Sequence, residues 1–161
     1  MDPPTGTGGD EGGTMITVVR RMDCAPAAVL DVLADGWSYV AWVVGASRIR
    51  SVSPDWPAEG ARIEHSVGLW PALLDDVTDV KAWDPENGID LVARGWPAGE
   101  AAVSIRVKAR PDGCVVRIDE DVVAGPGTLV PRPLRAAVLR ARNTETLRRL
   151  SYLAERRTSS D

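Results

Sequence analysis

Two titratable side chains occupy positions where strand alternation directs them inward: His65 and Glu120. His65 is the only histidine in the chain and lies in the stretch GARIEHSVGLW, where apolar and polar residues alternate. Successive side chains of a strand point to opposite faces, so His65 shares one face with Ile63, Val67 and Leu69. Because that face is otherwise apolar, we expect His65 to point into the interior.

Strand alternation also predicts the direction of the Glu120 side chain, which lies in the stretch CVVRIDEDVV. Val116, Ile118 and Val122 share its face of the predicted strand, so the carboxyl group is also expected to point inward. A carboxylate that faces a largely apolar concavity is costly unless it is paired or hydrogen-bonded. An imidazole nearby, or a ligand hydroxyl, would offset this cost at Glu120.

Two interpretations of this pair stay open. In a dry pocket, an imidazole and a carboxyl group can serve as polar anchors or as an acid and a base tuned toward neutral pH. Alternatively, both are structural groups, with His65 bonding a backbone carbonyl and Glu120 bonding Arg94 or a buried hydroxyl. Strand periodicity places the side chains but does not decide between these roles.

The aromatic residues add a second hint of a cavity, because the chain has six tryptophans and no phenylalanine. Such residues line the mouth of a pocket for a flat apolar ligand, or they sit at the rim between core and water. Of the six, Trp42 and Trp70 are predicted to lie near a ligand. The predicted ligand-binding set is Trp42, Ile63, His65, Val67, Leu69, Trp70, Ile118 and Glu120.

The elements that must position these residues can be predicted from periodicity and turn signals. A strand over residues 15–23 precedes two short helices. The first has Pro26 in its first turn and ends near Gly36, and the second begins near Ser38 and ends at Gly45. The breaks SPDWPAEG, DPENG and RPDG have turn compositions, so hairpins and an antiparallel sheet are expected. The remaining strands are predicted at 46–53, 61–70, 73–83, 89–96, 101–110 and 114–123.

One long helix is predicted over residues 133–157. Its inner stripe consists of residues spaced by three or four, and a set of arginines at seven-residue spacing is expected to point elsewhere. This basic face suits an anionic membrane surface, or it is a solvated face supported by pairs with Glu145. The stripe is Leu139, Asn143, Leu147, Leu150 and Ala154, and the arginines are Arg135, Arg142, Arg149 and Arg156.

This order of elements resembles the helix-grip fold of the START-like, birch-pollen-allergen-like superfamily, in particular its bacterial polyketide cyclase/dehydrase-like branch. The resemblance covers residues 15–157. It is carried by the stretches APAAVLDVLADGWSYVAWVVGASRI, GARIEHSVG, VKAWDPENGIDLVARGWP, VVRIDEDVVAGPG and VLRARNTETLRRL.

The resemblance implies an α+β domain in which a curved antiparallel sheet of about seven strands wraps round the long C-terminal helix. Two short helices lie between its first two strands. Proteins with this fold bind lipids, hormones, polyketides or quinones between sheet and helix, and only some are catalysts. Since no catalytic motif is shared, no catalytic residue is carried over. The fold also implies that its first and last strands pair, which brings Cys24 near Cys114.

Three functions are therefore weighed. The first is binding of a small hydrophobic, polyketide-like or lipid-like molecule in an internal cavity. The first alternative is a polyketide cyclase or dehydratase, in which His65 and Glu120 are the catalytic residues: one takes an acidic proton and the other polarises a carbonyl. The second alternative is a non-catalytic interaction module, for which a filled core and an exposed apolar patch are expected.

Composition excludes other classes. Residues 1–131 carry a net charge of -9 and residues 132–161 a net charge of +5, so most of the chain is acidic and nucleic acid is not an expected partner. The two cysteines lack CxxC spacing, so no metal and no cofactor are predicted. No apolar run is long enough for membrane insertion and no signal peptide is visible, so the default location is the cytoplasm.

The domain boundaries follow from the same composition. Residues 1–14 contain Gly, Pro, Thr and acids with almost no apolar residue, so a disordered extension is predicted, and the natural start could be Met15. Residues 15–157 form the single predicted domain, and 158–161 a flexible tail. The sequence leaves the ligand and the oligomeric state open.

Overall fold

The computed structural model describes residues 15–69, 71–95 and 99–158, and not the side chains of Leu69 and Thr158. The predicted disordered extension, residues 1–14, lies outside the described part of the chain. So do Trp70 and residues 159–161 of the predicted tail. Thr158, the first residue of that tail, is the last residue of the long helix.

The predicted order of elements is confirmed. A strand, two short helical segments and six further strands precede a short 3-10 turn and the long helix. Their bounds are β1 (Ile16–Met22), α1 (Pro26–Ala34), η1 (Gly36–Ser38), α2 (Tyr39–Trp42), β2 (Ala46–Val52), β3 (Arg62–Leu69), β4 (Ala72–Asp84), β5 (Gly88–Gly95), β6 (Gly99–Arg110), β7 (Gly113–Ala124), η2 (Pro126–Leu129) and α3 (Arg132–Thr158).

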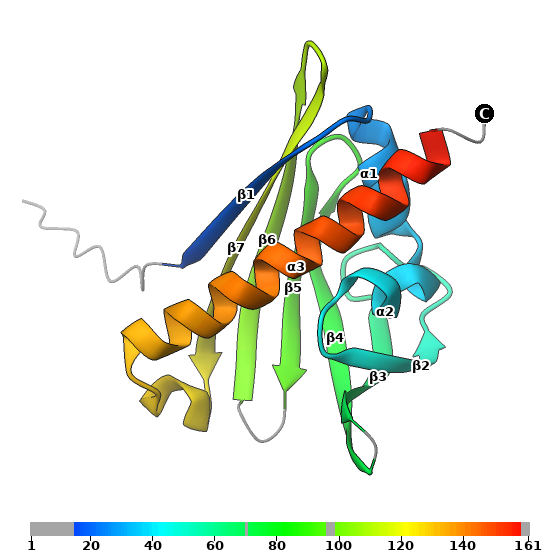
Figure 1. The fold of residues 1–161 in the computed structure, drawn as a ribbon. Helices are drawn as coiled ribbons and strands as arrows, with labels where there is room; N and C mark the ends of the chain where they lie inside the picture. Colours follow the sequence, from blue (N-terminus) through cyan, green and yellow to red (C-terminus); the bar gives the residue numbers. More distant parts are fainter. Residues whose placement is uncertain (1–14, 70, 96–98, 159–161) are drawn as a thin grey trace, which may run out of the picture.

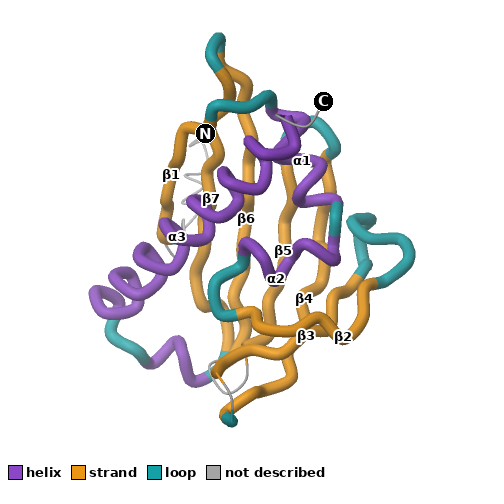
Figure 2. The backbone as a smooth tube through the Cα atoms, turned by 45° about the vertical axis from the view of Figure 1, so that its right-hand side comes forward, coloured by secondary structure: helices purple, strands orange, loops and turns teal. Residues whose placement is uncertain are grey.

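The strands form one antiparallel sheet in the order β1-β7-β6-β5-β4-β3-β2. Hairpins join the consecutive strands from β2 to β7, and β1 returns to pair with β7, from Ile16 opposite Glu120 to Met22 opposite Cys114. The sheet curves, and α3 runs across its concave face (Figures 1 and 2). This arrangement is the helix-grip fold that the resemblance implied.

The second helical segment differs from its prediction. In place of one helix from Ser38 to Gly45, the chain makes the 3-10 turn η1 and a single α-helical turn, α2. The Ser38 hydroxyl does not cap α2, because it donates to the carbonyls of Val32 and Asp35. Val43 already has an extended backbone. The short α2 places Tyr39 and Trp42 on the interior side, where both are buried.

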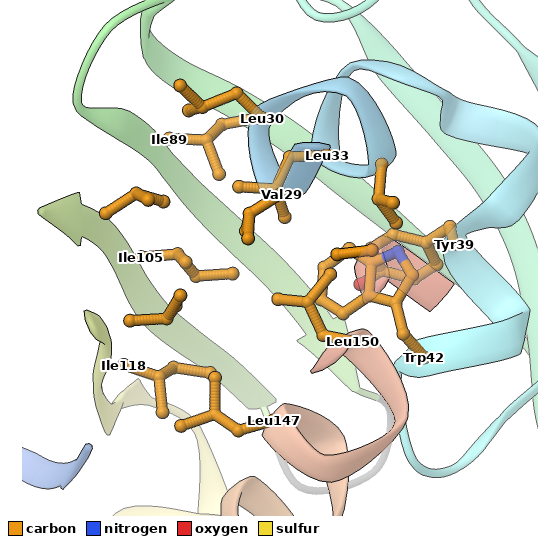
Figure 3. Close-up of a cluster of buried hydrophobic side chains, with 14 of the residues drawn as sticks. Val29, Leu30, Leu33, Tyr39, Trp42, Ile89, Ile105, Ile118, Leu147 and Leu150 are labelled. Carbon is orange, nitrogen blue, oxygen red and sulfur yellow. The ribbon is translucent and has the colours of Figure 1, made fainter. Parts of the chain in front are cut away.

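In the hydrophobic core, α1 packs near the C-terminal half of α3 (Figure 3). Pro26 begins α1, since a first helical turn needs no N–H from that residue. Val29 and Leu33 of α1, and Leu147 and Leu150 of α3, are each at most 1% exposed. Together they cover the part of the sheet that holds Ile89 and Ile105 (Figure 3).

The cysteines lie at the same end of the sheet. Cys24 and Cys114 are both buried and free. Burial, together with the neighbouring Cys114 thiol, raises the pKa of Cys24 to about 12, so the thiolate form is strongly disfavoured. The two cysteines are therefore close to each other, as the resemblance implied, and no disulfide joins them.

None of the described helices combines the length and the apolar composition needed to cross a membrane. Within the same residues, no group of three or more His, Cys, Asp or Glu side chains is arranged to hold a metal ion.

Candidate functional site

A cavity of about 450 Å³ lies between the concave face of the sheet and the N-terminal half of α3. Its volume is within the range of small-molecule pockets. The sheet contributes Leu91, Val103, Ile105 and Ile118 to its walls, and α3 contributes Leu139. Most of the lining is therefore apolar, and the polar groups are few enough to be described one by one.

The cavity reaches the surface beside the start of α3. Its lining there includes Val130, Leu134 and Val138, which are 37%, 58% and 59% exposed. The lining also includes Gly99, where β6 begins, whose φ of +110° is one that residues with side chains rarely adopt. A Cβ at Gly99 would lie 1.9 Å from the carbonyl oxygen of Ala124, so glycine is required for this close approach of the two strands.

His65 points into this cavity and is 2% exposed. Its Nε2 lies 3.1 Å from Thr78 Oγ1, and Thr78 Oγ1 lies 2.9 Å from the hydroxyl of Tyr39. All three side chains are buried, so the chain of hydrogen bonds is shielded from water. The tautomer of His65 decides the direction of these bonds: Thr78 either donates to Nε2 or accepts from it.

Asp76 lies beside His65, with Oδ2 3.8 Å from Nε2. Burial lowers the pKa of His65, and the charge of Arg50 adds to this shift while the Ser66 backbone opposes it. Burial raises the pKa of Asp76 to about 6. Both shifts favour the uncharged forms, which is the usual effect of desolvation on a buried acid and a buried base. Asp76 therefore titrates close to neutral pH at the wall of the cavity.

Glu120 is fully buried, and its Oε1 accepts a hydrogen bond from Arg142 Nη2 on α3. Two expectations are wrong here. Arg94, the predicted structural partner, instead binds Asp79 and Glu100. Arg142 was expected to point away from the interior, but its side chain extends to the Glu120 carboxylate on β7.

The reason for this difference lies in helix geometry. Arg142 follows Leu139 by three residues and precedes Thr146 by four, and both of these line the cavity. Residues at such spacing are neighbours on a helix surface, so Arg142 borders the inner stripe. Its side chain remains 37% exposed while its tip reaches the fully buried Glu120. A buried carboxylate needs such a partner.

Several buried polar atoms at the cavity wall have no hydrogen-bond partner among the described residues. They include Glu120 Oε2, Trp42 Nε1, and both side-chain amide atoms of Asn143. Asn143 is 1% exposed and Trp42 is 3% exposed. Buried polar groups in folded proteins are normally paired with protein or water, so these atoms lack the partner that such groups usually have.

The structure places the predicted site residues as follows. Lining the cavity are Trp42, His65, Val67, Ile118 and Glu120. Ile63 does not line the cavity. It lies two residues before His65 on β3 and is buried in the core. The side chain of Leu69 and the whole of Trp70 lie outside the described residues.

His65 and Glu120 thus line one cavity, but no hydrogen bond between their side chains occurs in the described structure. His65 belongs to a group with Thr78, Tyr39 and Asp76, whereas Glu120 belongs to a group with Arg142. The site therefore contains two polar groups on an apolar background.

Sequence reasoning missed Tyr39, Asp76, Thr78 and Arg142 as site residues, and it treated Asn143 only as part of the inner stripe. A signal existed for Asp76 and Thr78, since they alternate with the buried Val80 on β4. The spacing of Arg142 from Leu139 was a weaker signal. For Tyr39, the signal was hidden, because a one-turn helix has no measurable periodicity.

Comparison with known proteins identifies the architecture only. No protein-family model matches the chain, and no curated protein matches it. Among solved structures, it is similar to Ara h 8.0201, with a TM-score of 0.65, 10% identity and coverage of 87% of this chain and 96% of that one. SA2116 from Staphylococcus aureus, a protein of unknown function, gives a TM-score of 0.69, 9% identity, and coverage of 90% and 95%.

A third similar structure is the di-domain ARO/CYC protein StfQ from the steffimycin biosynthetic pathway. It gives a TM-score of 0.69 with 12% identity, and the match covers 91% of this chain and 52% of StfQ. This chain therefore spans about half of that di-domain protein. At such identities, the three matches support a common fold.

Proposed function

We propose, starting from the helix-grip fold that this chain shares with Ara h 8.0201 and StfQ, that the protein binds a small, largely apolar molecule in its internal cavity. The observation that carries the proposal is the cavity of about 450 Å³ with apolar walls and a few buried polar groups. Pockets of this kind gain affinity from apolar burial and orientation from the polar groups.

The position of the cavity supports the same proposal. Its mouth is bordered by the exposed apolar side chains of Val130, Leu134 and Val138. Exposed apolar residues that adjoin a pocket are suited to the entry of an apolar ligand. An interaction module, the second alternative from the sequence, would have a filled interior, so the cavity supports ligand binding over that function.

A second candidate is a polyketide cyclase or dehydratase using His65 and Glu120. The observation that favours it is the buried chain from His65 through Thr78 to Tyr39, which can hold and move a proton. StfQ, described as an ARO/CYC protein, has the same fold. In such a cyclisation, Glu120 takes a proton from carbon, the resulting carbanion forms a C–C bond at a second carbonyl as its C=O π bond breaks, and the proton returns from Glu120 to the alkoxide oxygen. His65 in its uncharged form polarises that carbonyl by donating a hydrogen bond to its oxygen.

A binding experiment tests the leading proposal. N-phenyl-1-naphthylamine, an uncharged apolar dye, is titrated into the protein while its fluorescence is measured. We expect saturable binding at one site. Ala93 lines the cavity, so Ala93→Trp is expected to fill part of it and to weaken binding at least tenfold.

The matched control is Ala82→Trp, which adds the same side chain at an exposed position of β4. This variant should bind the dye as the unaltered protein does. Absence of dye binding, or equal affinities for the two tryptophan variants, would contradict the proposed cavity site. A mass spectrum of small molecules that co-purify with the protein would then address the natural ligand.

A further inference from the structure

One wall of the cavity concentrates charged and amide groups from two elements. Glu120 comes from β7, and Arg142 and Asn143 come from α3. Glu120 is 0% exposed and Asn143 is 1% exposed. All three line the cavity.

The hydrogen-bonding capacity of this wall is only partly used. Glu120 Oε1 accepts from Arg142 Nη2, while Glu120 Oε2 is buried without a donor among the described residues. Asn143 has its side-chain oxygen and nitrogen both unpaired there, and Arg142 Nε is a further buried donor. The wall therefore offers an acceptor at Glu120 and both a donor and an acceptor at Asn143.

The cations that line the cavity are already paired. Arg142 is paired with Glu120, and Arg135 Nε lies 2.9 Å from Asp121 Oδ1. These two arginines are the cations among the described lining residues, and Glu100 at the mouth is itself paired with Arg94. No lining cation is therefore left to neutralise an anionic ligand, and a ligand carboxylate would lie beside the carboxylate of Glu120.

A hydroxyl group satisfies this wall, because one group both donates and accepts. Its O–H can donate to Glu120 Oε2, and its lone pairs can accept from the amide nitrogen of Asn143 or from Arg142 Nε. An apolar ligand without such a group leaves these atoms unpaired. Leaving a buried polar group unsatisfied has a large cost, which is a strong source of selectivity.

We infer that the Glu120–Arg142–Asn143 wall selects uncharged ligands that carry a hydroxyl group, such as phenols and alcohols on an apolar skeleton, over carboxylic acids of the same shape. The inference rests on the proposed function, since it concerns the same cavity. It adds the chemical class of the ligand.

Three probes that share one aromatic skeleton test this inference: naphthalene, 2-naphthol and 2-naphthoate. The affinity of the protein for each is measured by calorimetry at neutral pH. For the unaltered protein, we expect 2-naphthol to bind at least tenfold more tightly than naphthalene, and 2-naphthoate to bind more weakly than naphthalene. Naphthalene reports the apolar cavity, and the other two report the polar wall.

Two variants sharpen the test. Glu120→Gln removes the negative charge and leaves the Arg142 guanidinium unpaired, so binding of 2-naphthoate should rise at least tenfold. Asn143→Leu removes one donor and one acceptor but leaves Glu120 and Arg142, so it should reduce the preference for 2-naphthol over naphthalene without any gain for 2-naphthoate. A purely structural role for these residues would change the melting temperature and affect all three probes alike.

The outcomes separate the two proposals. If naphthalene binds but the three probes have equal affinities, or if 2-naphthoate binds most tightly, the wall does not select hydroxyl groups and only the proposed function stands. If none of the three binds, the proposed function fails and this inference with it. The ranking on the unaltered protein needs no variant, so the inference is tested even if Glu120→Gln does not fold.

Discussion

The two halves of α3 contact different parts of the interior. In the C-terminal half, Leu147, Leu150 and Ala154 are fully buried and pack into the core with α1 (Figure 3). In the N-terminal half, Leu134 and Val138 are more than half exposed and border the cavity mouth. One continuous helix therefore packs into the hydrophobic core with its C-terminal half and forms a wall of the cavity with its N-terminal half.

The arginines of α3 at seven-residue spacing show the same division. Residues seven apart lie on nearly the same side of a helix, yet their partners differ. Arg135 and Arg142 pair with Asp121 and Glu120 on β7. Arg149, one heptad farther on, pairs with Glu145 of its own helix. Spacing fixes the side of the helix, whereas the neighbouring element decides what the side chain does.

The largest expected effect on stability is in the C-terminal half of α3, which packs into the core. Leu147→Ala or Leu150→Ala should lower the free energy of unfolding by about 2 to 5 kcal/mol, because each removes a fully buried side chain and leaves a cavity. Val138→Ala is the matched control at the other end and should cost less than about 0.5 kcal/mol, since Val138 is mostly exposed. Urea denaturation measures both. Similar losses at the two ends would mean that the halves of α3 do not differ in this way.

The next effect depends on pH and lies at the cavity. Burial raises the pKa of Asp76 from 3.8 to about 6, so the folded state holds a proton that the unfolded chain releases. The stability associated with this group is present below pH 4, falls between about pH 4 and 6, and is fully lost above that. At about 1.4 kcal/mol per pKa unit, the loss is on the order of 3 kcal/mol.

Asp76→Asn cannot ionise and should remove this dependence. We expect the variant to be more stable than the unaltered protein by up to about 3 kcal/mol at pH 7, with the difference vanishing near pH 3.5. Asp112, an exposed carboxylate, provides the control, because Asp112→Asn should leave the pH profile unchanged. A constant difference at every pH would show that the effect does not come from titration of Asp76.

A smaller effect is expected from His65→Ala, which removes a polar side chain from the cavity wall. Affinity for 2-naphthol should change by roughly tenfold while the fold survives, because the fully buried core residues are untouched. If the protein is instead a cyclase, turnover of a polyketone should fall about a hundredfold with binding largely kept. A lower melting temperature with unchanged affinity would assign His65 a structural role only.

The fold was predictable from the sequence because its signals are local. Turn residues and alternation located the strands, and alternation on β3 and β7 placed His65 and Glu120 inward. The partners of these residues were not predictable. Whether Arg142 or Arg94 meets Glu120 depends on how α3 crosses the sheet, and the contact of Tyr39 with Thr78 depends on where α2 packs. Such contacts join residues 22 to 39 positions apart.

The smallest expected effect concerns Arg149, which has the same side chain and nearly the same helical side as Arg142 but a different partner. Arg149 Nε lies 2.9 Å from Glu145 Oε1 in a partly exposed pair within one helix, whereas the partner of Arg142 is fully buried. Exposed pairs at this spacing contribute about 0.3 to 0.5 kcal/mol, and alanine is itself a good helix former. Arg149→Ala should therefore change the free energy of unfolding by less than about 0.5 kcal/mol, and less still in high salt. Urea denaturation at two salt concentrations measures this difference. A loss above about 1 kcal/mol would mean that Arg149, like Arg142, contributes to tertiary packing, and that the division between the two halves of α3 lies farther toward its C-terminus.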